Sequence, residues 1–334
     1  MPLPVLDITN LREKPESRAA HTTAIQLRDI CHNAGFCYIV GHGMSARHSK
    51  IDAAMRQFFN LPLAERKKLN LINSPHFRGY TILGNELTGG KQDWRDQMDF
   101  CDEKPAPSIS KDDPTWLNLR GPNQWPETLP ALRPAVEAWM NGMYDIGNGL
   151  TRALAGSLGL DSDYFSPYFE PKGDARFKLI RYRVPETGGS SQKHNQGVGW
   201  HHDTGFLTFI MQDDIGGLQV NIDGKIIDAT PIKNALVMNM GEMLQVATGG
   251  YLRATPHRVI SPPPGKQRYS IAYFFNPKLE AQFTPIPLSP ELAGEAHGTQ
   301  NTDPNDPIFN IVGANILKTR LRAHPDMAAK YYGL

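Results

Sequence analysis

The spacing of apolar residues changes along the chain, from a helical period in the first half to short runs in the second. Apolar residues recur with helical spacing over Ser17–Ala34, His48–Phe59 and Leu129–Leu158, which predicts amphipathic helices. Pro4–Ile8 and Gly35–Val40 are rich in β-branched or aromatic residues and predict strands. The first half is therefore expected to be mainly helical.

From about Phe177 the chain reads as short strands separated by turn residues. Strands are predicted at Lys178–Val184, Thr208–Met211, Leu218–Val220, Lys225–Ala229, Ala235–Met240, Arg258–Ile260 and Tyr269–Phe275. Such a series is typical of a sandwich or jelly roll. After the loop-like Ala293–Pro307, the segment Asn310–Tyr332 predicts a C-terminal helix. We expect one structural unit of class α+β, with an N-terminal region (1–125), a β core (174–280) and the C-terminal helix (310–334).

Composition excludes several classes of partner. The 35 basic and 34 acidic residues give a net charge of +1, which offers no electrostatic footprint for nucleic acid or an anionic membrane. The cysteines Cys31, Cys37 and Cys101 are too few and too irregular for a disulfide framework or a cysteine-based zinc site, and the first two are expected to be buried. With no apolar run near the roughly 18 residues of a membrane span and no secretory signal, we expect a cytoplasmic protein.

A possible metal site begins at His201-His202-Asp203. In a strand, residues i and i+2 share a face, so His201 and Asp203 would point together and His202 away from them. His257, at the start of a β-branched run, could add a second imidazole from another strand. Two histidines and one carboxylate suit a non-haem Fe(II) site, although zinc accepts the same ligands.

The His-x-Asp pattern occurs again at His324-Pro325-Asp326. This copy lies in the predicted C-terminal helix, where residues i and i+2 do not share a face. We expect it to be a solvated helix start without a metal.

A second constellation follows at Arg268-Tyr269-Ser270, within an apolar run. Arg268 and Ser270 would share a strand face, and a guanidinium beside a hydroxyl forms a fork for one carboxylate. Tyr182 could add a third donor to that carboxylate.

At these residues the chain resembles the isopenicillin N synthase-like family of Fe(II)/2-oxoglutarate oxygenases. The resemblance extends over nearly the whole chain, through segments in the family's order: Asn33–Gly43, Phe58–Pro62, Arg78–Tyr80, Asp93–Asp96, His201–Thr208, Gly217–Val220, Asn239–Glu242, His257–Val259 and Arg268–Ser270. The family resemblance implies a double-stranded β-helix (jelly roll) flanked by N-terminal helices and a C-terminal helix.

The resemblance also implies the chemistry. His201, Asp203 and His257 would bind Fe(II), while Arg268 and Ser270, assisted by Tyr182, would bind 2-oxoglutarate as cosubstrate. With O2, the enzyme would oxidise a C–H bond of a small molecule, most often by hydroxylation, and release succinate and CO2.

Three other functions stay open at this point. An oxidase of the isopenicillin N synthase type would use no 2-oxoglutarate, and its Arg268 and Ser270 would hold the substrate's own carboxylate. A binding protein on a jelly-roll scaffold would consume no oxygen, and a zinc hydrolase would need a general base that the sequence does not place.

The substrate is less well defined by the sequence. Arg78, Tyr80, Arg181 and Phe275 are candidate contacts, and the arginines would suit an acidic substrate such as an amino acid or small peptide. The C-terminal helix is expected either to form a lid over the site or to bury Leu317 and Leu321 in the core.

Overall fold

The computed structural model describes residues 2–184, 195–298 and 306–334. The α-helices of these residues are α1 (Thr9–Glu13), α2 (Arg18–Asn33), α3 (Ser45–Asn60), α4 (Leu63–Lys68), α5 (Leu132–Ser157), α6 (Ser166–Phe169), α7 (Glu242–Ala247), α8 (Pro290–Gly294), α9 (Val312–Ala323) and α10 (Pro325–Tyr332). The strands are β1 (Val5–Asp7), β2 (Phe36–Val40), β3 (Gly79–Thr81), β4 (Leu87–Thr88), β5 (Lys91–Gln92), β6 (Arg95–Cys101), β7 (Arg176–Tyr182), β8 (Gln196–His201), β9 (Leu207–Gln212), β10 (Leu218–Ile222), β11 (Lys225–Asp228), β12 (Leu236–Met240), β13 (His257–Ile260) and β14 (Arg268–Phe275).

Two sheets form the centre of the molecule. Within the described residues, the larger sheet has eight strands in the order β1-β2-β12-β9-β14-β7-β6-β3, and the smaller has four in the order β11-β10-β13-β8. The pairing is antiparallel apart from the parallel pair β1–β2. This is the mixed α+β, jelly-roll architecture that was expected.

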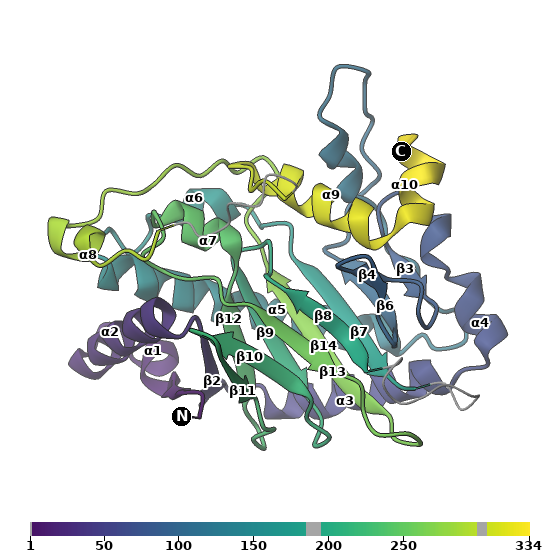
Figure 1. The fold of residues 1–334 in the computed structure, drawn as a ribbon, viewed down its shortest axis with the longest axis horizontal. Helices are drawn as coiled ribbons and strands as arrows, with labels where there is room; N and C mark the ends of the chain where they lie inside the picture. The colour runs from purple at the N-terminus through teal and green to yellow at the C-terminus, as the bar shows by residue number, and fades with distance from the viewer. Residues whose placement is uncertain (1, 185–194, 299–305) are drawn as a thin grey trace.

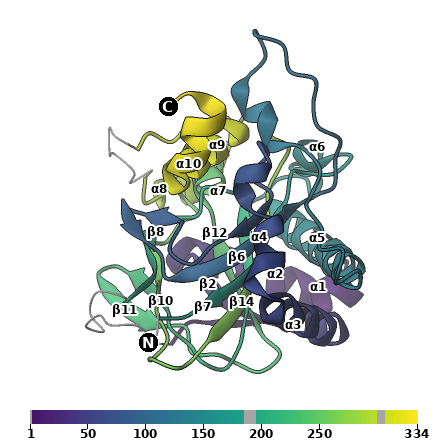
Figure 2. The same cartoon turned by 90° about the vertical axis from the view of Figure 1, so that its right-hand side faces the viewer.

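Helices cover one face of the large sheet, and the small sheet lies on the other. Figure 2 shows α1, α2, α3 and α5 on one side of the large sheet and β8, β10 and β11 on the opposite side. The C-terminal helices α9 and α10 lie across one end of the sheets (Figure 1). One apolar core fills the space between helices and large sheet, and a second lies between the two sheets. The functional site lies between the sheets.

Local sequence explains how α2 leads into this core. Ser17 caps its start, because the Ser17 hydroxyl accepts a hydrogen bond from the Ala20 amide at 3.1 Å. At its end Gly35 has φ +65°, and an added Cβ would lie 2.4 Å from the Arg253 carbonyl oxygen. The turn also brings the Thr255 hydroxyl to the Ala34 carbonyl, at 2.8 Å. The end of α2 therefore supports the segment that leads into β13.

Several elements differ from the expectation. Strand β6 was not predicted, because three of its five buried residues, Asp96, Gln97 and Asp99, are polar. The single C-terminal helix is in fact two, since Pro325 cannot continue a helix and His324 separates α9 from α10. Part of the predicted loop Ala293–Pro307 lies outside the described residues, and its first two residues belong to α8.

Other expectations hold. Cys31 and Cys37 are fully buried free thiols. Of the helices in the described part of the chain, none is both long and apolar enough to cross a membrane.

Candidate metal centre and cosubstrate site

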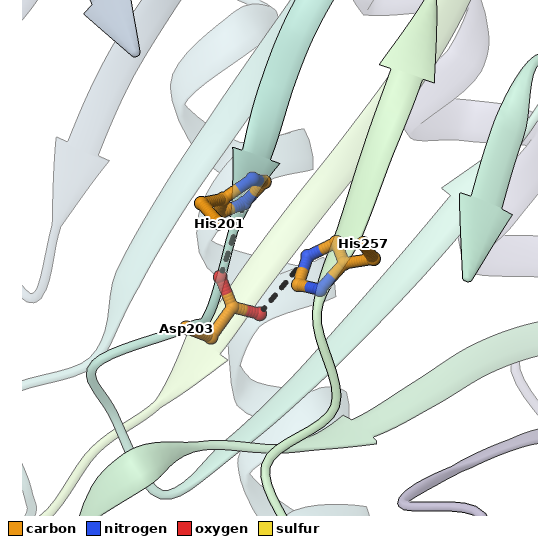
Figure 3. A group of neighbouring side chains, drawn as sticks. All are labelled: His201, Asp203 and His257. Atoms are coloured by element: carbon orange, nitrogen blue, oxygen red, sulfur yellow. Dashed lines mark ion pairs between the residues drawn. The ribbon is translucent and has the colours of Figure 1, made fainter. Parts of the chain in front are cut away.

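The predicted metal ligands meet at the edge of the small sheet. His201 ends β8 and is the direct cross-strand partner of His257, the first residue of β13. Nε2 of His201 lies 3.7 Å from Oδ1 of Asp203, and Nε2 of His257 lies 3.8 Å from Oδ2 (Figure 3). One ligand atom from each of the three residues lies within 4.8 Å of the other two. A single cation can therefore contact all three side chains.

Hydrogen bonds orient each ligand toward this point. Nδ1 of His201 lies 2.9 Å from the Gly199 carbonyl, and Nδ1 of His257 lies 3.2 Å from the Thr255 carbonyl. A carbonyl can only accept, so each Nδ1 carries the proton and each Nε2 is left with a free lone pair for a metal. Nδ2 of Asn239 donates to Oδ2 of Asp203 at 2.8 Å and fixes that carboxylate.

The protonation states also suit a metal. Burial, and after it the neighbouring His201, lower the pKa of His257 to about 4. Burial likewise lowers the pKa of His201. Burial by itself would raise the pKa of Asp203, but both histidines and Asn239 outweigh it and hold this pKa below its ordinary value. At neutral pH the site has two neutral imidazoles and one carboxylate, the forms that bind a divalent cation.

The structure brings together the three residues that the sequence grouped, with one difference in how Asp203 is placed. His202 is exposed and lies outside the group of three ligands. Asp203, however, is not in a strand, because β8 ends at His201. The turn after the strand places the Asp203 carboxylate beside both imidazoles.

A cavity of about 670 Å³ connects the metal ligands with the predicted carboxylate fork. Its lining includes Arg268, Ser270 and Tyr182. Arg268 is 1% exposed; its Nη1 lies 3.2 Å from the Ser270 hydroxyl and its Nη2 donates to the Gln212 side chain at 3.1 Å. Nε of Arg268 has no hydrogen-bond acceptor among the described residues, and the guanidinium lies 4.7 Å from the centre of the Tyr182 ring. The fork is thus held in place with donor capacity to spare.

Comparison with known proteins agrees with this geometry. Residues 177–277 match a family described as the 2OG-Fe(II) oxygenase superfamily, and residues 3–128 match one described as the N-terminal region of non-haem dioxygenases in morphine synthesis. The chain belongs to the 2OG-Fe(II) oxygenase superfamily. It is an Fe(II)- and 2-oxoglutarate-dependent dioxygenase that acts on a small molecule.

The names given to similar proteins include different small molecules. The chain is 33% identical to the 2-oxoglutarate-dependent dioxygenase frbJ of Dothideomycetidae sp. (strain 11243), over 98% of the chain and 91% of that protein. It is 33% identical to a homoarginine-6-hydroxylase of Arabidopsis thaliana, over 86% of the chain and 81% of that protein. A Neurospora crassa structure solved with alpha-KG and thymine has a TM-score of 0.71 at 26% identity, and the match covers 87% of this chain and 91% of that one.

Tyr80 and Arg181, two of the expected substrate contacts, are buried outside the cavity and bind Asp96. The Tyr80 hydroxyl donates to Asp96 at 2.7 Å, and Nη2 of Arg181 donates to the same carboxylate at 2.6 Å. Both side chains are buried and neither lines the cavity. On β7 the cavity-lining residues are 176, 178, 180 and 182, so Arg181 necessarily points to the other face.

The other two contacts are corrected on the same grounds. Arg78 donates to the carbonyls of His76 and Leu119 and lies outside the cavity. On β14 the even-numbered residues from 268 to 274 line the cavity, so Phe275 faces the helices, where it stacks on Phe169 at 4.4 Å between ring centres.

Charged residues that the sequence analysis missed form one end of the cavity wall. The Glu86 carboxylate forms salt bridges with Lys178 at 2.9 Å and with Arg95 at 2.7 Å. Arg320 of α9 forms a salt bridge with Asp99 at 3.0 Å. The period of two along β7, from Tyr182 back to Lys178, is the signal that could have found this part of the wall.

His324 also belongs to this buried region, so the expectation of a solvated helix start was wrong. Its side chain is 1% exposed and its Nε2 lies 3.4 Å from Oε1 of Glu86. Burial and the nearby Arg320 charge lower the pKa of His324. The residue helps to fix the C-terminal helices to the cavity wall.

Proposed function

We propose that this oxygenase oxidises a C–H bond of a free amino acid or a similar small carboxylic acid. In this proposal His201, Asp203 and His257 hold Fe(II), and Arg268, Ser270 and Tyr182 hold the far carboxylate of 2-oxoglutarate. The observation that carries it is that both groups open onto one cavity of about 670 Å³. That volume lies within the roughly 300–1,000 Å³ typical of small-molecule sites.

The reaction would balance as substrate C–H plus O2 plus 2-oxoglutarate giving substrate C–OH plus succinate plus CO2. Bound iron would supply the redox chemistry that couples the two oxidations. The chain's own part is to orient the cosubstrate through Arg268.

The amino-acid class is supported by charge and by relatives. The cavity wall carries side chains of both signs, including Arg176 and Glu242, and an amino acid also carries both. The homoarginine-6-hydroxylase of Arabidopsis thaliana, to which the chain is 33% identical, takes its name from an amino-acid substrate.

The test is succinate formation by the Fe(II)-loaded protein under air with 2-oxoglutarate and a panel of metabolites. The panel holds free amino acids, L-homoarginine among them, together with thymine and neutral alcohols. We expect at least one amino acid to raise succinate formation above the rate without substrate and to give a product heavier by one oxygen atom. Stimulation by thymine or a neutral compound alone would refute the substrate class.

A further inference from the structure

Arg176 occupies the end of the cavity opposite to Arg268. It is the first residue of β7 and pairs with Phe274 of β14, while Tyr182, at the other end of β7, pairs with Arg268. The two arginines are thus separated along the strand pair by six residues, or roughly 20 Å at about 3.3 Å per residue. A five-carbon diacid held at Arg268 does not reach Arg176.

Within the described part of the chain, Arg176 differs from its charged neighbours in having no salt bridge. Lys178 and Arg320 each lie within 3.0 Å of a carboxylate oxygen. Among the described residues no carboxylate lies within ion-pair distance of Arg176, and its Nε has no hydrogen-bond acceptor. Its guanidinium instead lies 4.8 Å from the centre of the Phe274 ring, and both side chains line the cavity.

Among the described residues the half-buried Arg176 thus has no salt bridge, although Asp99 and Asp203 are near enough to act on its charge. Burial, and then the nearby charge of Arg320, lower the pKa of Arg176 to about 10, so it remains a cation at neutral pH. A cation taken out of bulk water destabilises the fold unless a counter-charge and hydrogen bonds compensate it. Arg176 lines the same cavity as the metal ligands His201, Asp203 and His257.

We propose that Arg176 binds a carboxylate of the substrate and so selects acids over their neutral analogues. This inference rests on the proposed function, because it concerns the second ligand of the same cavity. The planar guanidinium matches a carboxylate through two parallel hydrogen bonds, and the Phe274 ring keeps it in one plane. Arg268 then serves 2-oxoglutarate and Arg176 serves the substrate.

The first test measures stability without substrate. The variant Arg176→Met keeps the chain length and the contact with Phe274 but removes the charge. The matched control Arg320→Met removes a buried arginine that has a partner. In the protein loaded with iron and 2-oxoglutarate under nitrogen, we expect the melting temperature of Arg176→Met to equal or exceed that of the wild type, by roughly 2 °C. That of Arg320→Met should fall. A decrease in Arg176→Met would show that a group of the protein already neutralises Arg176, and would overturn the proposal.

The second test measures selectivity with L-homoarginine, other free amino acids and the carboxamide of each. We expect the wild type to prefer the acid in kcat/KM. Arg176→Met should lose roughly 30-fold or more on the acid and much less on the amide, so that the preference for the acid disappears. Arg176→Lys should keep part of the preference. If Arg176→Met still preferred the acid as strongly as the wild type, with 2-oxoglutarate turnover intact, Arg176 would not bind the substrate carboxylate. The proposed function would be unaffected by that result. If no acid stimulates the wild type, the proposed substrate class fails, and the melting comparison decides the role of Arg176.

Discussion

Replacing Arg268 by Met should weaken 2-oxoglutarate binding while leaving the metal centre intact. Arg268 is 1% exposed, so its charge acts on a ligand with little screening by water. Its Nη atoms are already positioned by Ser270 and Gln212, and Met is long enough to keep the contact with Tyr182. The change therefore removes the charge and the fork with little loss of packing.

The expected size of the effect follows from burial. Removing one partner of a buried, hydrogen-bonded charge pair costs about 2–5 kcal/mol, which is about 30- to 5,000-fold in affinity. Ser270 and Tyr182 still offer hydrogen bonds to the carboxylate, so we expect the lower part of that range, about 100-fold. Ser270→Ala removes one neutral hydrogen bond, worth about 0.5–1.5 kcal/mol, and should cost about 2- to 13-fold. Arg268→Lys keeps the charge without the fork and should fall between the two.

The assay is calorimetric titration of 2-oxoglutarate into the metal-loaded protein under nitrogen, with metal content measured on the same samples. A wild-type affinity retained in Arg268→Met would refute the assignment. If 2-oxoglutarate affinity were unchanged but substrate turnover were lost, Arg268 would bind the substrate's carboxylate instead, as in an oxidase that needs no cosubstrate. Loss of metal as well would mean that the substitution disturbs the fold.

Three further outcomes are expected. Asp203→Ala should abolish metal binding while His202→Ala keeps one metal per chain, as measured by elemental analysis; the reverse would overturn the register. Glu86→Gln leaves Lys178 and its neighbours without their counter-charge and should reduce the free energy of unfolding by about 3–5 kcal/mol, whereas the exposed Glu137→Gln should leave the urea midpoint unchanged. Burial lowers the pKa of His48 to about 4, so the unfolded chain binds its proton first as the pH falls; stability should drop by about 3 kcal/mol between roughly pH 6.5 and pH 4, and His48→Phe should flatten that part of the urea-midpoint profile.

The parts of the fold that sequence could predict are those where burial and apolar character coincide. Strand β12, Leu236–Met240, is entirely buried and was located within one residue. Strand β6 is also largely buried, but its Asp96 is fully enclosed by ionic and hydrogen-bonded partners from distant segments, Arg181 among them. The spacing of apolar residues cannot reveal a strand whose polar side chains are buried through ion pairs with distant residues.

Alternation along a strand was enough to group Arg268 with Ser270, whereas Asp203 joins His201 through the turn that follows β8. The rule that placed Arg268 with Ser270 also places Phe274 in the cavity and Phe275 outside it, as the structure shows. The candidate contacts Tyr80 and Arg181 failed for a different reason. Their partner Asp96 lies on β6, and no local pattern reveals that a strand far along the chain supplies a buried carboxylate.

The position of α9 bears on whether the C-terminal segment is a lid or a structural helix. Val312 and Ile316 are buried in the core, and Arg320, on the same face at the i+4 spacing, pairs with Asp99. The neighbouring face contributes Thr319 to the cavity wall. Opening α9 as a rigid lid would break a buried ion pair, at about 3–5 kcal/mol, and expose two aliphatic side chains, each worth about 1.5–3 kcal/mol. Such a cost exceeds what one small ligand readily supplies, so we expect α9 to remain in place during turnover as a fixed wall of the cavity.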